Sequence, residues 1–65
     1  ETENTIKDKE IPEAIQKDIQ REFPNMKITE AENVISATKG EFYDIEFKQK
    51  GKNKDVEYRR DGSKV

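Results

Sequence analysis

Residues 42–48 read FYDIEFK and residues 55–60 read DVEYRR. In both stretches apolar and polar side chains alternate, which is the period-two pattern of a strand with one buried face. Tyr43, Ile45 and Phe47 share one face of the first stretch, and Val56 and Tyr58 share one face of the second. The two stretches predict an antiparallel hairpin whose apolar face packs against another element, while its polar face meets water.

The glycine between these stretches sets the predicted register. A two-residue turn at Gly51–Lys52 has glycine first, as a type II′ turn prefers. This turn creates four facing pairs: Phe47 with Val56, Ile45 with Tyr58, Lys48 with Asp55, and Asp44 with Arg59. The last two pairs bring opposite charges together, which favours this register. Its one unfavourable pair is Glu46 opposite Glu57.

Residues 11–23 carry the pattern of an amphipathic helix. Apolar side chains recur there at intervals of three and four positions, which places them on one face: Ile11, Ala14, Ile15, Ile19 and Phe23. Pro12 suits the first helical turn, and Pro24 disfavours helical geometry at the residue before it. The apolar stripe predicts that this helix packs on the apolar face of the sheet.

Residues 26–38 predict a further strand, but their apolar residues change phase along it. A bulge reconciles Ile28 with Ala31 and Ile35, whereas a turn at Lys39–Gly40 places Val34 opposite Ile45, and the sequence leaves both open. Beyond the hairpin, Asp61–Gly62 is a type I′ turn signal that starts a very short last strand.

The first ten residues are polar, with one apolar member, and predict a flexible polar arm or at most a short edge strand. A single domain over residues 11–65 follows. The predicted fold class is α+β, with one N-terminal helix packed on an antiparallel meander of three to four strands.

Composition restricts the function. The chain has 65 residues, 43% of them charged, with no Cys and no His, which excludes disulfides, thiolate metal sites and histidine acid–base chemistry. No apolar run is long enough to span a membrane. These absences predict a protein that is not an enzyme and has no cofactor and no metal site.

Charge is unevenly placed along the chain. Residues 1–46 carry six basic and twelve acidic groups, whereas residues 47–65 carry seven basic and three acidic groups. A nucleic-acid surface would interleave the basic residues with aromatic ones. Only Tyr58 lies near Lys48–Lys54, so we interpret these lysines as a solvated hairpin whose charge discourages edge-to-edge pairing.

The spacing of the helix and turn signals resembles the PepSY-like family, whose members are also described as putative β-lactamase-inhibitor-like proteins. The residues that carry the resemblance span nearly the whole chain: Ile11-Pro12, Ile15, Ile19, Phe23-Pro24, Ile28, Ala31, Tyr43, Ile45, Phe47, Gly51, Val56, Tyr58 and Asp61-Gly62. The resemblance implies a helix packed on an antiparallel sheet, a secreted or periplasmic location in the bacterial cell envelope, and a non-catalytic role in binding and restraining peptidases. β-Lactamase inhibitor proteins use a concave sheet made of two such units, whereas this chain holds one.

Three surfaces are candidate sites. The first is the water-facing side of the sheet, where an exposed aromatic ringed by charges has the composition of a protein-binding anchor with a polar rim: Phe42, Asp44, Glu46, Glu57 and Arg59. The second is the sheet edge at Val56–Arg60, to which a partner strand or a second copy of the chain could add. The third consists of two carboxylate pairs, Glu30 with Glu32 and Glu46 with Glu57, for which metal binding or catalysis is disfavoured because the sheet face is wet.

Together these features predict a non-catalytic, secreted protein-binding module. Its partner is a protein, either a peptidase or another domain of the same parent chain, and not a nucleic acid or a membrane. The chain itself is predicted to be a monomer or a weak homo-oligomer. The alternatives are a structural spacer without a dedicated ligand and a nucleic-acid binder acting through the basic hairpin.

Overall fold

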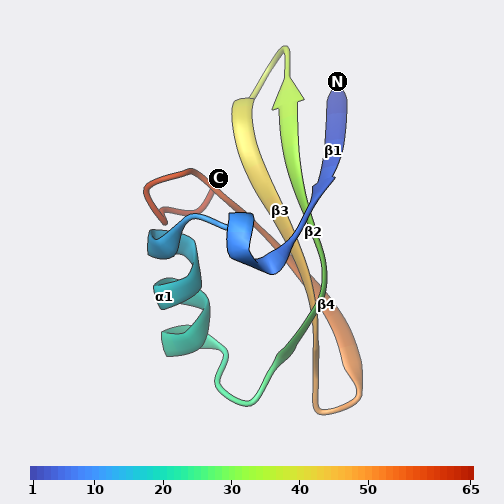
Figure 1. Ribbon diagram of the computed structural model, residues 1–65, viewed down its shortest axis with the longest axis vertical. Coiled ribbons are helices and arrows are strands. Elements are labelled where there is room, and N and C mark those ends of the chain that lie inside the picture. Colours follow the sequence, from blue (N-terminus) through green and yellow to red (C-terminus); the bar gives the residue numbers. More distant parts are fainter.

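Four antiparallel strands form one sheet in the order β1-β2-β3-β4, and a short helix lies on one side of it (Figure 1). The computed structural model describes residues 1–65. In chain order the elements are β1 (Thr2–Ile6), the 3-10 helix η1 (Asp8–Glu10), α1 (Glu13–Glu22), β2 (Lys27–Ser36), β3 (Gly40–Gln49) and β4 (Lys52–Tyr58). Strands β2, β3 and β4 follow one another as hairpins, whereas the chain reaches β2 from β1 through η1 and α1.

The predicted fold class, with an N-terminal helix on a meander, is wrong in its order of elements. A strand precedes the helix, and the molecule is mostly antiparallel sheet with one short helix. The fourth strand is the N-terminal β1, which pairs with β2 from Thr2↔Ile35 to Ile6↔Ala31. At the other end of the chain, the predicted last strand is reduced to one isolated bridge between Tyr58 and Lys64.

Strand β1 has no alternating apolar pattern because it lies at the sheet edge and is exposed along most of its length. Ile6, at its end, is the one residue that packs against the core. The strand is held mainly by backbone pairing to β2, a non-local interaction that leaves no periodic signal in the sequence. For Thr2–Ile6 the structure therefore shows a short edge strand and not a flexible arm.

The register of the β3–β4 hairpin differs from the predicted one by two residues. The turn lies at Lys50–Gly51, with φ of 53° and 78°, and Gln49 pairs with Lys52. Positive φ at both central residues is the geometry of a type I′ turn, which takes glycine second and not first. Ile45 therefore faces Val56 and not Tyr58. A shift by two positions keeps every side chain on its predicted face, so the apolar side is unchanged.

Strand β2 contains the bulge that its sequence suggested. Its register against β3 shifts between Ile28 and Glu30, which returns Ile28 and Ala31 to the same face of the sheet. The alternative, with Val34 opposite Ile45, is wrong because Val34 pairs with Phe42.

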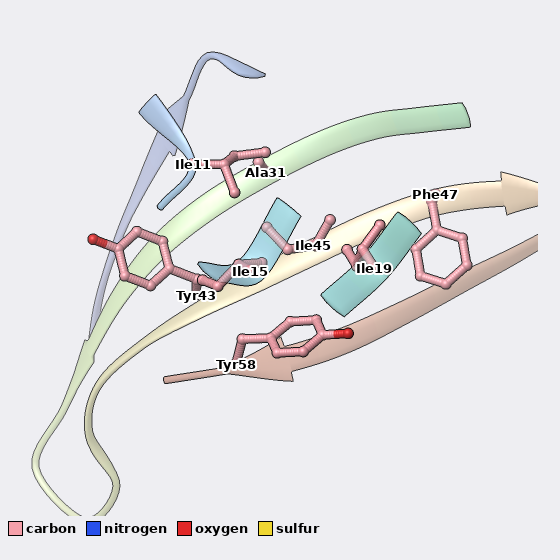
Figure 2. Packing of buried hydrophobic residues seen from close by; sticks show 8 residues of the cluster. All are labelled: Ile11, Ile15, Ile19, Ala31, Tyr43, Ile45, Phe47 and Tyr58. Atoms are coloured by element: carbon pink, nitrogen blue, oxygen red, sulfur yellow. The ribbon is translucent and has the colours of Figure 1, made fainter. Parts of the chain in front are cut away.

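The core lies between α1 and the apolar face of the sheet (Figure 2). Ile15 and Ile19 of the helix are fully buried over Ile45, Phe47 and Tyr58, as the helical stripe predicted. Burying a side chain of this size stabilises the fold by roughly 1.5–3 kcal/mol. No helix of the structure has the length and the apolar character that crossing a membrane requires.

The last residue of β4 and the segment after it tie the helix to the sheet. The Tyr58 hydroxyl donates a 2.8 Å hydrogen bond to Asp18 of α1, and this bond holds the pKa of the Asp18 carboxyl below its usual value. Gly62, at φ of 91°, lies against the helix backbone, where a Cβ would come within 2.9 Å of the Ala14 carbonyl oxygen. After the turn at Gly62 the chain runs back along β4, and the Val65 N–H donates to the Glu57 carbonyl.

Candidate functional site: the acidic face of the sheet

The side of the sheet opposite α1 carries six carboxylates in a regular array across β2, β3 and β4, and Glu3 of β1 faces the same side. Because alternate residues point to opposite faces, the partners of the buried strand residues point away from the helix. The strand registers align them in two rows, which we call the acidic face: Glu30, Glu46 and Asp55 in the first row, and Glu32, Asp44 and Glu57 in the second. Each row crosses β2, β3 and β4, so every member has another carboxylate directly opposite it.

This arrangement reverses the predicted charge pattern. The sequence suggested opposite charges across the hairpin, but the structure places Asp44 opposite Glu57 and Glu46 opposite Asp55. Like charges in such positions destabilise a sheet. The free protein therefore holds an unfavourable concentration of negative charge on one face, which a cationic ligand would relieve.

Asp44 lies at the centre of the second row and is the most perturbed carboxylate of the array. Its Oδ1 atom is buried and has no hydrogen-bond partner. Burial, together with the neighbouring charges of Asp55, Glu57, Glu32 and Glu46, raises the pKa of Asp44 to about 6. Burial also raises the pKa of Glu32, together with the charges of Glu3, Glu30 and Glu46.

Three of the carboxylates come close enough to share a cation. Oxygen atoms of Glu30, Glu32 and Glu46 lie within 4.8 Å of one another. Carboxylate oxygens are the ligands that calcium and magnesium prefer. Glu30 and Glu46 are exposed on the open side of the sheet, so the array suits exchangeable cationic groups better than a fixed coordination shell.

At the end of the acidic face near the β2–β3 turn lies an apolar patch. Phe42 packs opposite Val34 and is only 3% exposed. Lys39 Nζ lies over the Phe42 ring, 5.5 Å from its centre, and Arg59 Nη1 donates to the carbonyl oxygens of Lys39 and Glu41 in the adjoining turn. The prediction of Phe42 as an exposed aromatic anchor is therefore wrong in its exposure.

The other predicted protein-binding residues fall on this surface in two groups. Asp44, Glu46 and Glu57 are neighbours within the acidic face. Arg59 is partly buried, and its hydrogen bonds to the Lys39 and Glu41 carbonyls fix the β2–β3 turn. Sequence reasoning missed Lys39, which forms an ion pair of 3.3 Å with Glu57. A lysine in a turn gives no periodic signal, and only the hairpin geometry brings it to Glu57.

The predicted binding edge at Val56–Arg60 is partly occupied by the chain itself. The C-terminal segment returns along β4, with the Val65 N–H donating to the Glu57 carbonyl and the Arg59 N–H donating to the Ser63 carbonyl. These bonds satisfy two backbone groups that an added strand would need. The part of the edge that stays open belongs to the lysine-rich end of β4.

The lysines form a second charged region at the β3–β4 turn. Lys48, Lys50, Lys52 and Lys54 are exposed, and Lys27 of β2 lies opposite Lys48. None of them takes part in an ion pair. The sheet is thus polarised, with negative charge over its middle and positive charge at one end.

Comparison of the chain with protein-family models, with curated proteins and with solved structures gave no match. The resemblance to the PepSY-like family therefore stays a prediction, and function is argued from the geometry of the acidic face.

Proposed function

We propose that the protein is a non-catalytic binding module whose acidic face takes a basic segment of another polypeptide. The observation that carries this proposal is the array of six carboxylates, in which four cross-strand pairs are like-charged. Each facing pair of like charges costs a few tenths of a kcal/mol, up to about 1 kcal/mol. A partner that brings cations to these positions removes that repulsion and gains direct ion pairs.

The spacing of the carboxylates indicates the shape of the partner. Asp44 and Glu46 are two positions apart on β3, so their side chains are separated by about 6.8 Å along the strand. The same relation holds for Glu30 with Glu32 and for Asp55 with Glu57. An extended segment with arginine or lysine at every second residue has this repeat, so that it matches both rows at once.

Charge complementarity of this kind acts first on association. Negative charge gathered on one face steers a cationic partner and raises its association rate, an effect that falls with ionic strength. Beside the array, a shallow depression of about 530 Å³ is lined by two carboxylates, Glu46 and Asp55, and by two lysines, Lys48 and Lys54. Its charges balance, so the attraction for a cationic partner comes from the two carboxylate rows and not from this depression.

Catalysis fits this surface less well. General acid–base work needs two groups with separated pKa values in a dry, enclosed setting. Asp44 has a raised pKa, but the face around it is open to water and the chain has neither His nor Cys. The resemblance adds the further proposals that the partner is a peptidase or a second domain of the parent chain and that the location is secreted or periplasmic.

Binding of a defined peptide tests the proposal. The probe is an acetylated and amidated peptide with four arginines alternating with serines, titrated into the protein by calorimetry at low salt. We expect it to bind, and to bind several-fold more tightly than a peptide with the same composition and four contiguous arginines, because only alternating cations all face one side of an extended chain.

Matched variants locate the binding surface. The double variant Asp44→Asn with Glu46→Gln is expected to weaken binding about tenfold, because it removes one carboxylate from each row. Asp8→Asn with Glu13→Gln removes the same charge away from the acidic face and is expected to change affinity less than about twofold. Equal losses in both variants, or no binding by the unmodified protein, would contradict the proposal.

A further inference from the structure

The β2–β3 turn places a cation of the chain itself on the acidic face. Lys39 Nζ lies 3.3 Å from Glu57 Oε1 and 5.5 Å from the centre of the Phe42 ring. Phe42 is on the open side of the sheet, yet it is 3% exposed, with Lys39 lying over its ring. The ring and the Glu57 carboxylate thus form two walls of a cation site that Lys39 fills in the free protein.

The backbone of the turn is fixed independently of the Lys39 side chain. Arg59 Nη1 donates to the Lys39 and Glu41 carbonyls, and the Ser36 hydroxyl oxygen accepts hydrogen bonds from the Thr38 and Lys39 N–H groups. The Lys39 side chain, by contrast, is 51% exposed, and Glu57 is the one group to which its ammonium is bonded. Lys39 can therefore leave the site by rotation of its side chain while the turn keeps its shape.

We propose that Lys39 stands in for an arginine of the partner, which displaces it from the Phe42–Glu57 site when the complex forms. The inference rests on the proposed function and names its specificity-determining contact. An arginine fits the site better than a lysine, because a planar guanidinium stacks on an aromatic face and also forks to carboxylates. Asp44 lies directly opposite Glu57, so a second carboxylate borders the site.

Displacement of Lys39 is feasible because the contacts it loses are weak. Ion pairs between exposed groups contribute little to stability, and an exposed cation–π contact adds a comparable amount. Competition from Lys39 nevertheless lowers the apparent affinity for the partner, which scales with the fraction of time that the site is free. In this proposal the face of the Phe42 ring takes the partner's arginine once Lys39 has moved aside.

Removal of the competing lysine tests the inference. Lys39→Ala is expected to tighten binding of the alternating-arginine peptide roughly three- to tenfold. Lys48→Ala is the matched control: it removes the same charge from the same face, but Lys48 has no carboxylate partner. We expect less than half of the effect from this control. Circular dichroism verifies that each variant is folded, and Lys39→Gln replaces the alanine variant should the latter unfold.

Two further readouts identify the contact itself. In the complex of the unmodified protein, nuclear Overhauser contacts are expected between a peptide arginine and the ring protons of Phe42. Phe42→Leu is then introduced into the Lys39→Gln variant, because leucine fills the space without offering a π face. We expect the resulting loss of affinity to be roughly threefold larger for the arginine peptide than for a peptide in which lysines replace the arginines.

The outcomes separate the two proposals. Equal tightening by Lys39→Ala and Lys48→Ala, or no Overhauser contact to Phe42 in a complex that forms, would overturn the displacement while the acidic face remains a binding surface. No binding of the peptide by either the unmodified protein or Lys39→Ala would overturn both.

Discussion

Replacing Asp44 with asparagine should stabilise the protein at neutral pH. The pKa of Asp44 is raised to about 6 in the folded state, against 3.8 for the ordinary group. The stability that comes from its protonated form is therefore complete below pH 3.8 and is lost as pH rises through 6. About two pKa units correspond to a ceiling of about 3 kcal/mol, which solvent screening of a partly exposed side chain reduces to about 1–2 kcal/mol.

Asp44→Asn keeps the shape of the side chain and supplies an amide that can donate to Glu32 or Glu57 beside it. At pH 7.5 we expect a gain in unfolding free energy of about 1–2 kcal/mol, which in a domain of this size raises Tm by about 4–16 °C. At pH 4 the native Asp44 is protonated, so the gain should nearly vanish. Thermal and urea unfolding followed by circular dichroism at the two pH values measures both quantities.

The control for this substitution is Asp8→Asn, which makes the same chemical change at an exposed position away from the acidic face. It should leave stability within about 0.5 kcal/mol at both pH values. Loss of stability in Asp44→Asn at pH 7.5, or a gain of the same size at pH 4, would refute the argument that a charged Asp44 is held unfavourably among carboxylates.

Four further predictions concern stability, the pKa of Asp18 and the pH dependence of peptide binding. Phe42→Ala should cost about 3 kcal/mol or more in urea unfolding because the ring is buried, and a cost below about 1 kcal/mol would speak against that burial. Lys50→Asn should add about 0.5–1 kcal/mol, since asparagine tolerates the positive φ of the turn better than lysine; an unchanged or lower Tm argues against a type I′ turn. Tyr58→Phe should let the pKa of Asp18 rise toward its usual value, and a carbon-13 titration that shows no rise contradicts the hydrogen bond. Affinity for the alternating-arginine peptide should fall between pH 7 and pH 5, because Asp44 gains a proton in this range and one negative charge of the face is lost. The groups around Asp44 are Glu32, Glu46, Asp55 and Glu57. Calorimetry that finds equal affinity at the two pH values would contradict this prediction.

The helix and the apolar side of the sheet could be predicted because their signals are local. Ile15 and Ile19 fall on one helical face, and Tyr43, Ile45 and Phe47 fall on one strand face, whatever the rest of the chain does. Burial of these stripes against each other is the largest favourable term in a domain with so few apolar residues. The structure confirms both stripes.

The hairpin register could not be settled by the same reasoning. Turns at Gly51–Lys52 and at Lys50–Gly51 differ by two positions in pairing, so both put the same residues on the apolar face. Charge pairing then favoured the wrong register, since it assumes that the sheet minimises its own repulsion. In the structure Asp44 faces Glu57 instead. A sequence that accepts this repulsion is consistent with a face shaped by a ligand and not by stability.

Only part of the site could be predicted, because strand register also decides which of its side chains come together. Its carboxylates are visible in the sequence, but Glu30 and Glu32 on β2 join Glu46 in one array only through the bulged register of β2. The burial of Phe42 was missed because its neighbours, Val34 across the β2–β3 pair and Lys39 in the turn, come to it only through the hairpin register. The edge strand Thr2–Ile6 gives no periodic signal, because backbone pairing to β2 is its main contact and Ile6 alone packs against the core.

The array of facing carboxylates is tested most directly by the pairing of β3 with β4 in solution. Non-hydrogen-bonded partners in an antiparallel pair bring their Hα atoms close together. The structure predicts Hα–Hα Overhauser cross-peaks between Asp44 and Glu57 and between Glu46 and Asp55. Cross-peaks that instead join Phe47 to Val56 and Ile45 to Tyr58 would restore opposite charges across the hairpin and remove the basis of the acidic face.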